Sequence, residues 1–447
     1  MIKDLTEGKP SSVLWRFSIP MFVSVIFQQL YNIADSAIAG KFAGESALAA
    51  VGASYPITMI FMAVAVGSNI GCSVVISQLF GAKRYTEMKT AVSTTLFSSG
   101  VLAVALMVLG LLGTNGLLRL LNTPEDVFAD GAVYLKIYIG GFLFLFLYNI
   151  CTGVFTSLGD SRTPLYFLIG SSLSNIFLDY WFVTSFHMGV AGVAWATFLA
   201  QGAACILAFF TLLYRLRKIR TQERPPVFSL SMLKRVSRIA IPSILQQSFI
   251  SVGNIFIQWR VNQFGSSVIA GYSAAIKLNT FTITSFTTLA NGLSGFTAQN
   301  VGAGKTGRVR EGLRSGILLA FLIAIPFAIA FFFFGTTMIR LFLPAGSDVG
   351  EALLTGRDFL KIVSPFYFVI SVKLMADGVL RGAGAMKYFM TATFTDLVLR
   401  VILAFLFSMV PSLGATGIWL SWPVGWTTAT IVSCVFYQTG KWRHGRI

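Results

Sequence analysis

Four carboxylates stand within long apolar stretches of this sequence, and they are its first candidates for chemistry. These four are Asp35, Asp179, Asp377 and Asp396, whereas the other acidic residues lie in polar segments or near their borders. A carboxylate inside a membrane-spanning segment costs at least about 2.5 kcal/mol on insertion scales, so each is a functional candidate by default. Reversible protonation and cation binding are the chemistry that such a group can supply.

Asp35 belongs to a short polar stripe. Gln28 and Asn32 are four residues apart, and Asp35 comes seven residues after Gln28, so a helix carries all three on nearly the same face. Burial favours the neutral form of a carboxyl group, which suits reversible protonation. The alternative is a carboxyl group whose only role is to make packing hydrogen bonds.

Asp179 has an amide partner at helical spacing. Asn175 precedes it by four residues, so both side chains point to the same side of a helix. Carboxylate and amide oxygens are the ligands that hard cations prefer. The pair could hold Na⁺ or pass a proton, and the alternative is an interfacial Asp near the end of its span. No other metal site is expected.

The composition predicts that these residues lie in a membrane protein. Of the 447 residues, 55% are hydrophobic and only 11% are charged, whereas soluble domains carry roughly 25% charged residues. Apolar runs of membrane-spanning length, about 20 residues, recur along the chain. Backbone groups in lipid must be satisfied within their own segment, so the runs are expected to be α-helices.

The net charge of +17 has a simple cause, because Lys and Arg gather in alternate loops. This is the positive-inside pattern, so both termini and the central loop are expected in the cytoplasm and no nucleic-acid partner is expected. The predicted location is a bacterial inner membrane, with membrane lipids as surroundings.

We predict an all-α integral membrane fold with twelve transmembrane helices. The longest loop, about 215–238, holds Pro225-Pro226 and eight basic residues. It divides the chain into an N-lobe (1–216), a basic linker (217–233) and a C-lobe (234–447). The expected spans are 13–39, 47–78, 88–113, 130–156, 164–184, 190–214, 236–262, 268–299, 312–335, 355–380, 388–409 and 415–438.

The two halves repeat each other. Pro20 matches Pro242 and Asn32 matches Asn254, and the matched residues are 221 to 225 positions apart throughout. Each half has six spans and therefore the same orientation, so the two bundles are expected to be related by a pseudo-two-fold axis along the membrane normal. Such repeats are typical of transporters that work by alternating access.

The second half carries a different set of charges. The repeat places Ile257 opposite Asp35 and Ala404 opposite Asp179, so the acidic site of the first half has no copy. Two interpretations of the second set are open: internal neutralisation of charges four residues apart, and a gate or proton relay. The residues of this C-lobe charge network are Lys277, Lys373, Asp377, Asp396 and Arg400.

A polar stripe on span 236–262 is expected to line a substrate cavity. It includes Gln246, Asn254 and Gln258, and Gln28 and Asn32 are the candidates from the first span. Hydrogen bonds between helices are the alternative use of such side chains.

No enzyme motif is present in the sequence. It has no Walker loop, no nucleophile elbow and no His-rich or Cys-rich metal motif, so we expect neither an enzyme nor a cofactor. A channel is the less favoured transport mode, because the repeat and the unequal charges of the lobes favour alternating access.

Several turns together resemble the multidrug and toxic compound extrusion (MATE) family. They are Gln78-Leu-Phe-Gly81-Ala82, Gln299-Asn-Val-Gly302-Ala303, Leu158-Gly159-Asp160-Ser-Arg162-Thr-Pro164 and Leu380-Arg381-Gly382-Ala383-Gly384. The resemblance covers essentially the whole chain. It implies export of amphipathic, often cationic compounds, driven by inward H⁺ or Na⁺. We expect the protein to be a monomer. The alternative within the wider superfamily is a flippase for lipid-linked oligosaccharides or lipids.

The resemblance also implies particular site residues. The family's first-helix acid matches Asp35, and its N-lobe cation site matches Asn175, Asp179 and Thr197, the last supplied by the resemblance alone. The NorM branch carries two further acids in the C-lobe, where this sequence has Ile250 and Ile370. The chain is therefore more similar to the DinF-like or a general bacterial branch, and no C-lobe cation site is carried over.

Overall fold

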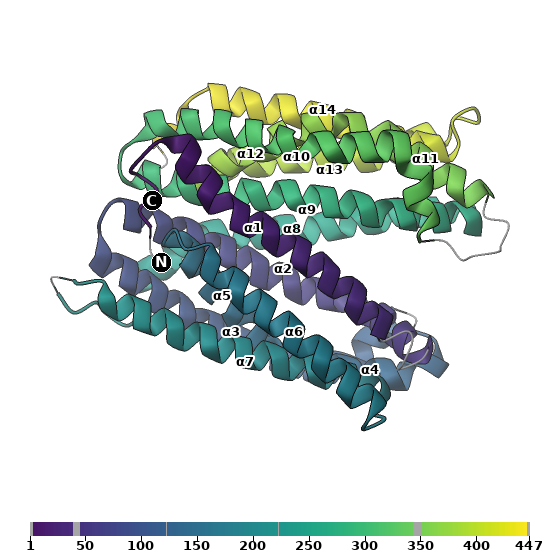
Figure 1. Ribbon diagram of the computed structural model, residues 1–447, viewed down its shortest axis with the longest axis horizontal. Helices are drawn as coiled ribbons and strands as arrows, with labels where there is room; N and C mark the ends of the chain where they lie inside the picture. Colours follow the sequence, from purple (N-terminus) through teal and green to yellow (C-terminus); the bar gives the residue numbers. More distant parts are fainter. Residues whose placement is uncertain (1–2, 39–44, 122, 222, 343–349, 445–447) are drawn as a thin grey trace. The chain divides into compact units, whose positions relative to one another are not determined.

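The structure, a computed structural model, describes residues 3–38, 45–121, 123–221, 223–342 and 350–444. The side chains of residues 34–38, 45–49, 126 and 444 also fall outside the description. Every regular element within the described ranges is a helix (Figure 1). This confirms the expected all-α fold.

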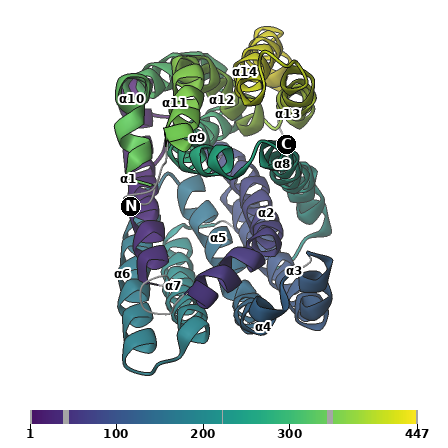
Figure 2. The same ribbon diagram turned by 90° about the vertical axis from the view of Figure 1, so that its right-hand side faces the viewer.

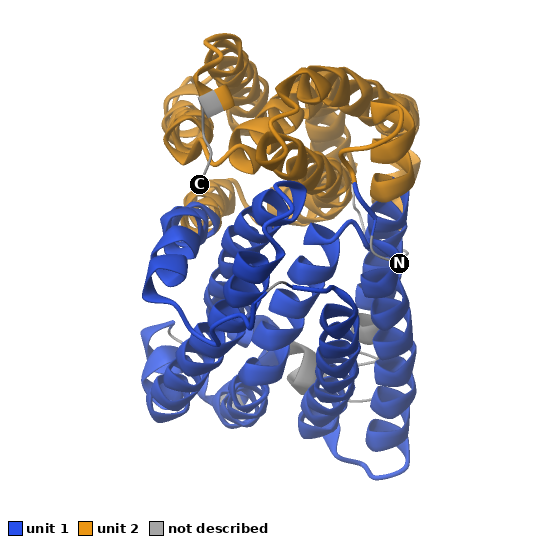
Figure 3. Cartoon of the chain, turned by 90° about the vertical axis from the view of Figure 1, so that its left-hand side faces the viewer, with its two compact units in different colours: residues 1–4, 19–247 blue, residues 5–18, 248–447 orange. Residues whose placement is uncertain are grey.

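The chain folds into two compact units, which Figure 3 distinguishes by colour. Unit 1 comprises residues 1–4 and 19–247, and unit 2 comprises residues 5–18 and 248–447. The helices that begin in the first half of the chain are α1 (Pro10–Ile38), α2 (Glu45–Gly81), α3 (Tyr85–Leu120), α4 (Glu125–Gly140), α5 (Phe142–Ser157), α6 (Arg162–Thr184) and α7 (Gly189–Lys218). The later ones are α8 (Leu230–Asn262), α9 (Ser266–Gly302), α10 (Thr306–Arg340), α11 (Gly350–Val363), α12 (Tyr367–Gly382), α13 (Met386–Ser408) and α14 (Ala415–Gln438).

Most of these helices suit a bilayer by length and composition. Within the described ranges, eight helical stretches are long and apolar enough to cross a membrane, and the bent α4–α5 pair makes a ninth. Helices α6, α9 and α14 fall outside this set, and α9 carries polar residues such as Asn279, Thr282 and Asn300, all of them buried. Its polar side chains therefore face other helices, for example where the Tyr367 hydroxyl donates to Asn279 Oδ1 at 3.1 Å.

Two of the expected spans are broken helices. The expected span 130–156 consists of α4 and α5, which bend by 45° next to Gly141. The expected span 355–380 consists of α11 and α12, joined by a 3₁₀ turn at Ser364–Phe366 that contains Pro365. Glycine and proline both weaken the continuous helical hydrogen-bond ladder, which explains why the breaks fall at these residues.

Helices α1 and α8 are the two that divide between the units. Residues 5–18 pack in unit 2, where a Cβ on Gly295 would lie 3.6 Å from the Phe17 ring. The first part of α8 packs in unit 1 against α2 so closely that a Cβ on Gly71 would lie 2.5 Å from the Ala240 Cβ. Small residues at helical spacing allow this kind of close approach in membrane bundles.

Helix α6 is held at its start by Asp160. This carboxylate is 2% exposed and accepts hydrogen bonds from the Thr163 hydroxyl at 2.8 Å and the Thr163 backbone N–H at 3.1 Å. Arg215, near the end of α7, donates to its Oδ2 at 2.6 Å. Asp160 therefore fixes α6 against α7, and the two helices lie side by side in unit 1 together with α5 (Figure 2).

The surroundings of Asp160 also decide its protonation. Burial acts to raise the pKa of this carboxyl group, but the hydrogen bonds and positive charge around it, the bonds from Thr163 among them, hold the pKa below its ordinary value.

We expect Gly71→Val to destabilise unit 1 by about 1–3 kcal/mol, because the added side chain overlaps the α8 backbone. Thermal unfolding of the purified protein measures the effect. Gly52→Val is the matched control on the same helix, since a Cβ there meets nothing within 4 Å. Equal losses of stability in the two variants would contradict the close α2–α8 contact.

Asp160→Asn should lower the free energy of unfolding by about 2 kcal/mol at neutral pH, because charge-assisted hydrogen bonds are lost. The folded-state pKa lies below the unfolded value of about 3.9, so this contribution is complete above that pH and is lost as the pH falls through the folded pKa. The difference in melting temperature between the unaltered protein and Asp160→Asn should therefore disappear only at acidic pH. A difference that stays constant down to strongly acidic pH would contradict the assignment.

Candidate functional site: an ion and substrate site

The buried side of α6 is polar and its outer side is apolar. Asn175 and Asp179 are 3% and 0% exposed, whereas Phe177 and Trp181 are 63% and 44% exposed. This arrangement is the reverse of a helix in water, and it places the two polar side chains inside unit 1. The spacing of four residues puts them one turn apart, as the sequence predicts.

Asn175 and Asp179 contact each other directly. The Asn175 Nδ2 donates to Asp179 Oδ2 at 3.1 Å. The amide thereby turns its oxygen, Asn175 Oδ1, toward α1. The amide thus presents its NH₂ group to the carboxylate and its oxygen points away, so the Asp179 carboxylate is the group here whose chemistry fits a proton or a hard monovalent cation.

Tyr31 of α1 completes this group, and the sequence reasoning did not select it. Its hydroxyl donates to Asn175 Oδ1. A signal was available, because Tyr31 lies four residues before Asp35 and so on the same helical face. Asp35 lies on the next turn of α1, but its side chain falls outside the described residues.

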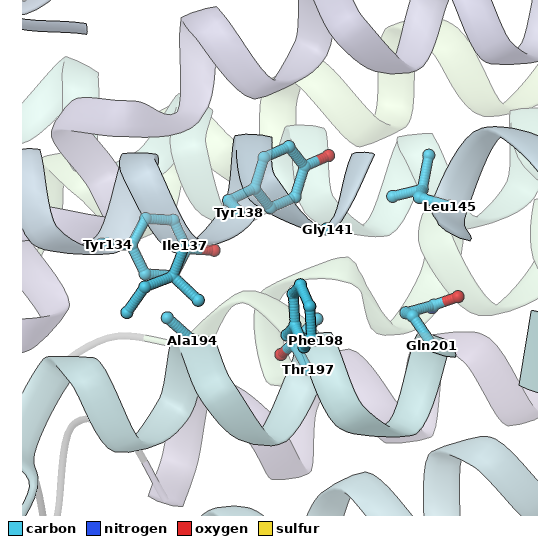
Figure 4. Close-up of a pocket in the computed structure, with 9 residues that line it drawn as sticks. All are labelled: Tyr134, Ile137, Tyr138, Gly141, Leu145, Ala194, Thr197, Phe198 and Gln201. Atoms are coloured by element: carbon cyan, nitrogen blue, oxygen red, sulfur yellow. The ribbon is translucent and has the colours of Figure 1, made fainter. Parts of the chain in front are cut away.

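Thr197 lies in a small pocket at the bend between α4 and α5. Its hydroxyl donates to the Val193 carbonyl of its own helix at 3.1 Å. Figure 4 shows the pocket between α4, α5 and α7. Gln201, one turn further along α7, has a buried Oε1 with no hydrogen-bond partner among the described residues. The pocket is lined by Tyr134, Ile137, Tyr138, Gly141, Leu145, Ala194, Thr197, Phe198 and Gln201.

The polar residues expected to line a cavity differ in exposure. Gln28, Asn32 and Asn254 are exposed, Gln258 is half-buried and Gln246 is buried. Gln258 uses its Nε2 to donate to Asn262 Oδ1 at 2.7 Å, one turn along α8. This bond lies within α8, so it is neither a cavity contact nor the bond between helices that was the alternative, and the role of the stripe stays a prediction.

The charged residues of unit 2 fall into separate groups. Lys373 and Asp377 form a buried ion pair at 2.9 Å, and the Ser433 hydroxyl donates to Asp377 Oδ1 at 2.6 Å. Asp396 and Arg400 have the same spacing, but the described structure contains no ion pair between them. Lys277 is exposed near the Phe342 ring, at 5.9 Å from its centroid.

Other proteins share this fold over nearly the whole chain. The probable multidrug resistance protein YpnP of Bacillus subtilis is 29% identical over 441 residues, which cover 98% of this chain and 97% of that protein. The structure of a MOP superfamily transporter from Pyrococcus furiosus superposes with a TM-score of 0.91 at 23% identity, over 98% and 97% of the two chains. The structure of a mutant of the Vibrio cholerae MATE transporter VcmN superposes with a TM-score of 0.89 at 20% identity, over 96% of this chain and 97% of that chain.

These structures show the fold, which is twelve transmembrane helices in two bundles. Twelve spans result here when α4–α5 and α11–α12 each count as one broken helix. The model of the MatE family matches residues 20–181 and again residues 242–406, once in each half, as expected of a repeat. On these two matches the chain belongs to the MatE family and is a multi-pass membrane protein.

Proposed function

We propose that the protein is an antiporter that exports amphipathic, often cationic compounds in exchange for H⁺ or Na⁺. The observation that carries this proposal is the buried Asn175–Asp179 pair inside unit 1, with the half-buried Tyr31 bonded to Asn175. A carboxyl group at such a position can change its charge, and the change is felt strongly because no bulk water screens it. The multidrug resistance proteins related to this chain support the choice of substrate class.

The ion site in this proposal comprises Asp35, Asn175 and Asp179, with Thr197 of α7 as a further member. The cation approaches Asp179 and neutralises it, and Tyr31 fixes the Asn175 amide so that its oxygen keeps one orientation. The chain itself supplies the coupling groups, so no cofactor is required and no chemical bond in the substrate is broken. This places the protein among transporters and not among enzymes.

Exchange follows from unequal binding to two states. An ion and a drug oppose each other only when each binds a different conformation more tightly. The pocket beside the α4–α5 bend has room for a water and not for the ring of a substrate, and the Gln201 Oε1 is an acceptor beside it. In this proposal the protein is a monomer in a bacterial inner membrane, and the positive-inside rule favours both termini in the cytoplasm.

We expect Asp179→Asn and Asp35→Asn each to abolish drug efflux driven by an ion gradient. Proteoliposomes with H⁺ and Na⁺ gradients imposed separately measure the flux and identify the ion. Asp358→Asn is the matched control, because this carboxylate is exposed and pairs with Arg357 on the surface at 2.8 Å. Full gradient-driven efflux by the Asp179→Asn protein would overturn the proposal.

Tyr31→Phe should weaken coupling without abolishing it. Loss of one hydrogen bond worth about 1.4 kcal/mol corresponds to roughly tenfold in the apparent affinity for the ion. The ion concentration that gives half-maximal efflux should therefore rise about tenfold while the maximal rate changes little. If the ion concentration that gives half-maximal efflux does not change, the Tyr31 hydroxyl only packs against α6 and has no role in coupling.

A further inference from the structure

One face of α10 changes from basic to apolar along the helix. Arg310 and Arg314 are exposed near its start, and Leu318 and Leu322 follow at the same spacing of four residues, with 54% and 50% exposure. Residues four apart lie on one side of a helix, so these side chains form a single stripe. The mean hydropathy of α10 is 2.9, the highest among the described spans, as expected of a helix that contacts lipid.

The basic end of this stripe belongs to a cluster built from two helices. Arg310, Arg314 and Arg443 all lie within electrostatic reach of the Tyr437 phenol, near the end of α14. The turn that follows α14 is fixed, because Trp442 is 1% exposed and stacks on Tyr437 with 5.5 Å between the ring centroids. Its Nε1 also donates to the Tyr437 carbonyl at 2.9 Å. The three arginines are therefore held near one another.

These three arginines are exposed and have no carboxylate partner. Among the described residues, no ion pair includes Arg310, Arg314 or Arg443. Glu311 is also exposed on this turn of α10, and Lys441 adds a further cation beside Arg443, so positive charge prevails. Guanidinium groups bind phosphate oxygens well, because their planar fork matches the geometry of the oxygens. The cluster thus complements a phosphate group.

The apolar end of the same stripe reaches a groove of about 300 Å³. The groove lies between α10 and the α11–α12 break, and Ile325, Ile329 and Phe333 of α10 line it together with Pro365 and Phe368. Phe333 is 71% exposed, so the groove opens on the surface of unit 2. Sites for small molecules begin at about this volume, so the groove has room for an apolar chain.

The distance between the two ends of the stripe fits the length of a phospholipid. Ile325 and Ile329 follow Arg314 by eleven and fifteen residues, which places the groove about 16 to 22 Å further along α10 at the helical rise of about 1.5 Å per residue. The hydrocarbon core of a bilayer is about 30 Å thick, so the chains of one lipid reach about 15 Å below its headgroup. A chain whose phosphate contacts Arg314 therefore ends at the groove.

We propose that unit 2 carries a site for one anionic phospholipid along α10. Its phosphate contacts Arg310, Arg314 and Arg443, and one of its acyl chains lies along Leu318 and ends in the groove. A zwitterionic lipid has the same chains, but its cationic group is repelled by the arginines. Free phosphate meets the arginines but cannot use the groove. The site is separate from the ion site proposed in unit 1 and does not depend on it.

Native mass spectrometry of the purified full chain, titrated with dioleoyl phosphatidylglycerol or dioleoyl phosphatidylcholine, tests the basic end. Replacing both Arg310→Gln and Arg314→Gln should weaken phosphatidylglycerol binding roughly thirtyfold, because each basic residue near an anionic headgroup contributes about fivefold. Phosphatidylcholine binding should not change. Arg340→Gln is the matched control, since Arg340 is exposed at the other end of α10.

Three results of this titration would overturn the proposal. The first is equal affinity of the unaltered protein for the two lipids. The second is an equal loss of phosphatidylglycerol binding in the Arg340→Gln control. The third is displacement of phosphatidylglycerol by inorganic phosphate, because the arginines would then form a simple anion site.

Chain length tests the groove, and the unaltered protein suffices for the first comparison. Dihexanoyl phosphatidylglycerol has the same headgroup, but its chains end before the groove, so it should bind more weakly than the dioleoyl lipid. Ala328→Phe fills the groove and should remove this difference while dihexanoyl binding stays the same. Asp179→Asn should bind both lipids as the unaltered protein does, whether or not it transports drug. A dioleoyl preference that is absent, or that survives Ala328→Phe, would contradict a chain in the groove.

Discussion

The absence of water from a bilayer is the constraint on which the rest of this structure depends. Backbone groups in lipid must be paired within their own segment, which leaves helices as the element that can cross. The same constraint turns polar side chains inward, as on α6, where Asn175 and Asp179 are buried and Phe177 faces outward. Polar chemistry in this protein is therefore concentrated between helices.

The two halves share a scaffold but not their charges. The residues that the repeat places opposite Asp35 and Asp179 are Ile257 and Ala404, and both are fully buried. Unit 2 instead buries the Lys373–Asp377 pair and the Asp396–Arg400 region. A repeated fold can thus keep its helix packing while each copy buries a different set of ionisable groups, because packing depends on size and burial of charge depends on local partners.

Close helix contacts and helix breaks shape the bundles around these groups. Glycine permits the tight approach of α2 to α8 at Gly71 and of α14 to Asp396 of α13 at Gly425. The breaks at Gly141 and Pro365 interrupt two spans, and the first of them borders the pocket that contains Thr197. Backbone irregularity inside a membrane protein is tolerated where the surrounding helices bury it.

The sequence by itself determined the membrane class, the number of spans, the repeat and the set of intramembrane acids, because these depend on composition and on spacing along one helix. It also predicted the Asn175–Asp179 and Lys373–Asp377 contacts, which are formed within single helices. Only the tertiary structure decided which partners come from other helices. Tyr31 reaches Asn175 from α1, and Arg400 lies over Trp422 of α14 although Asp396 is one turn away. The physical reason is that the rotation of one helix against another selects among several possible partners, and local spacing carries no information about that rotation.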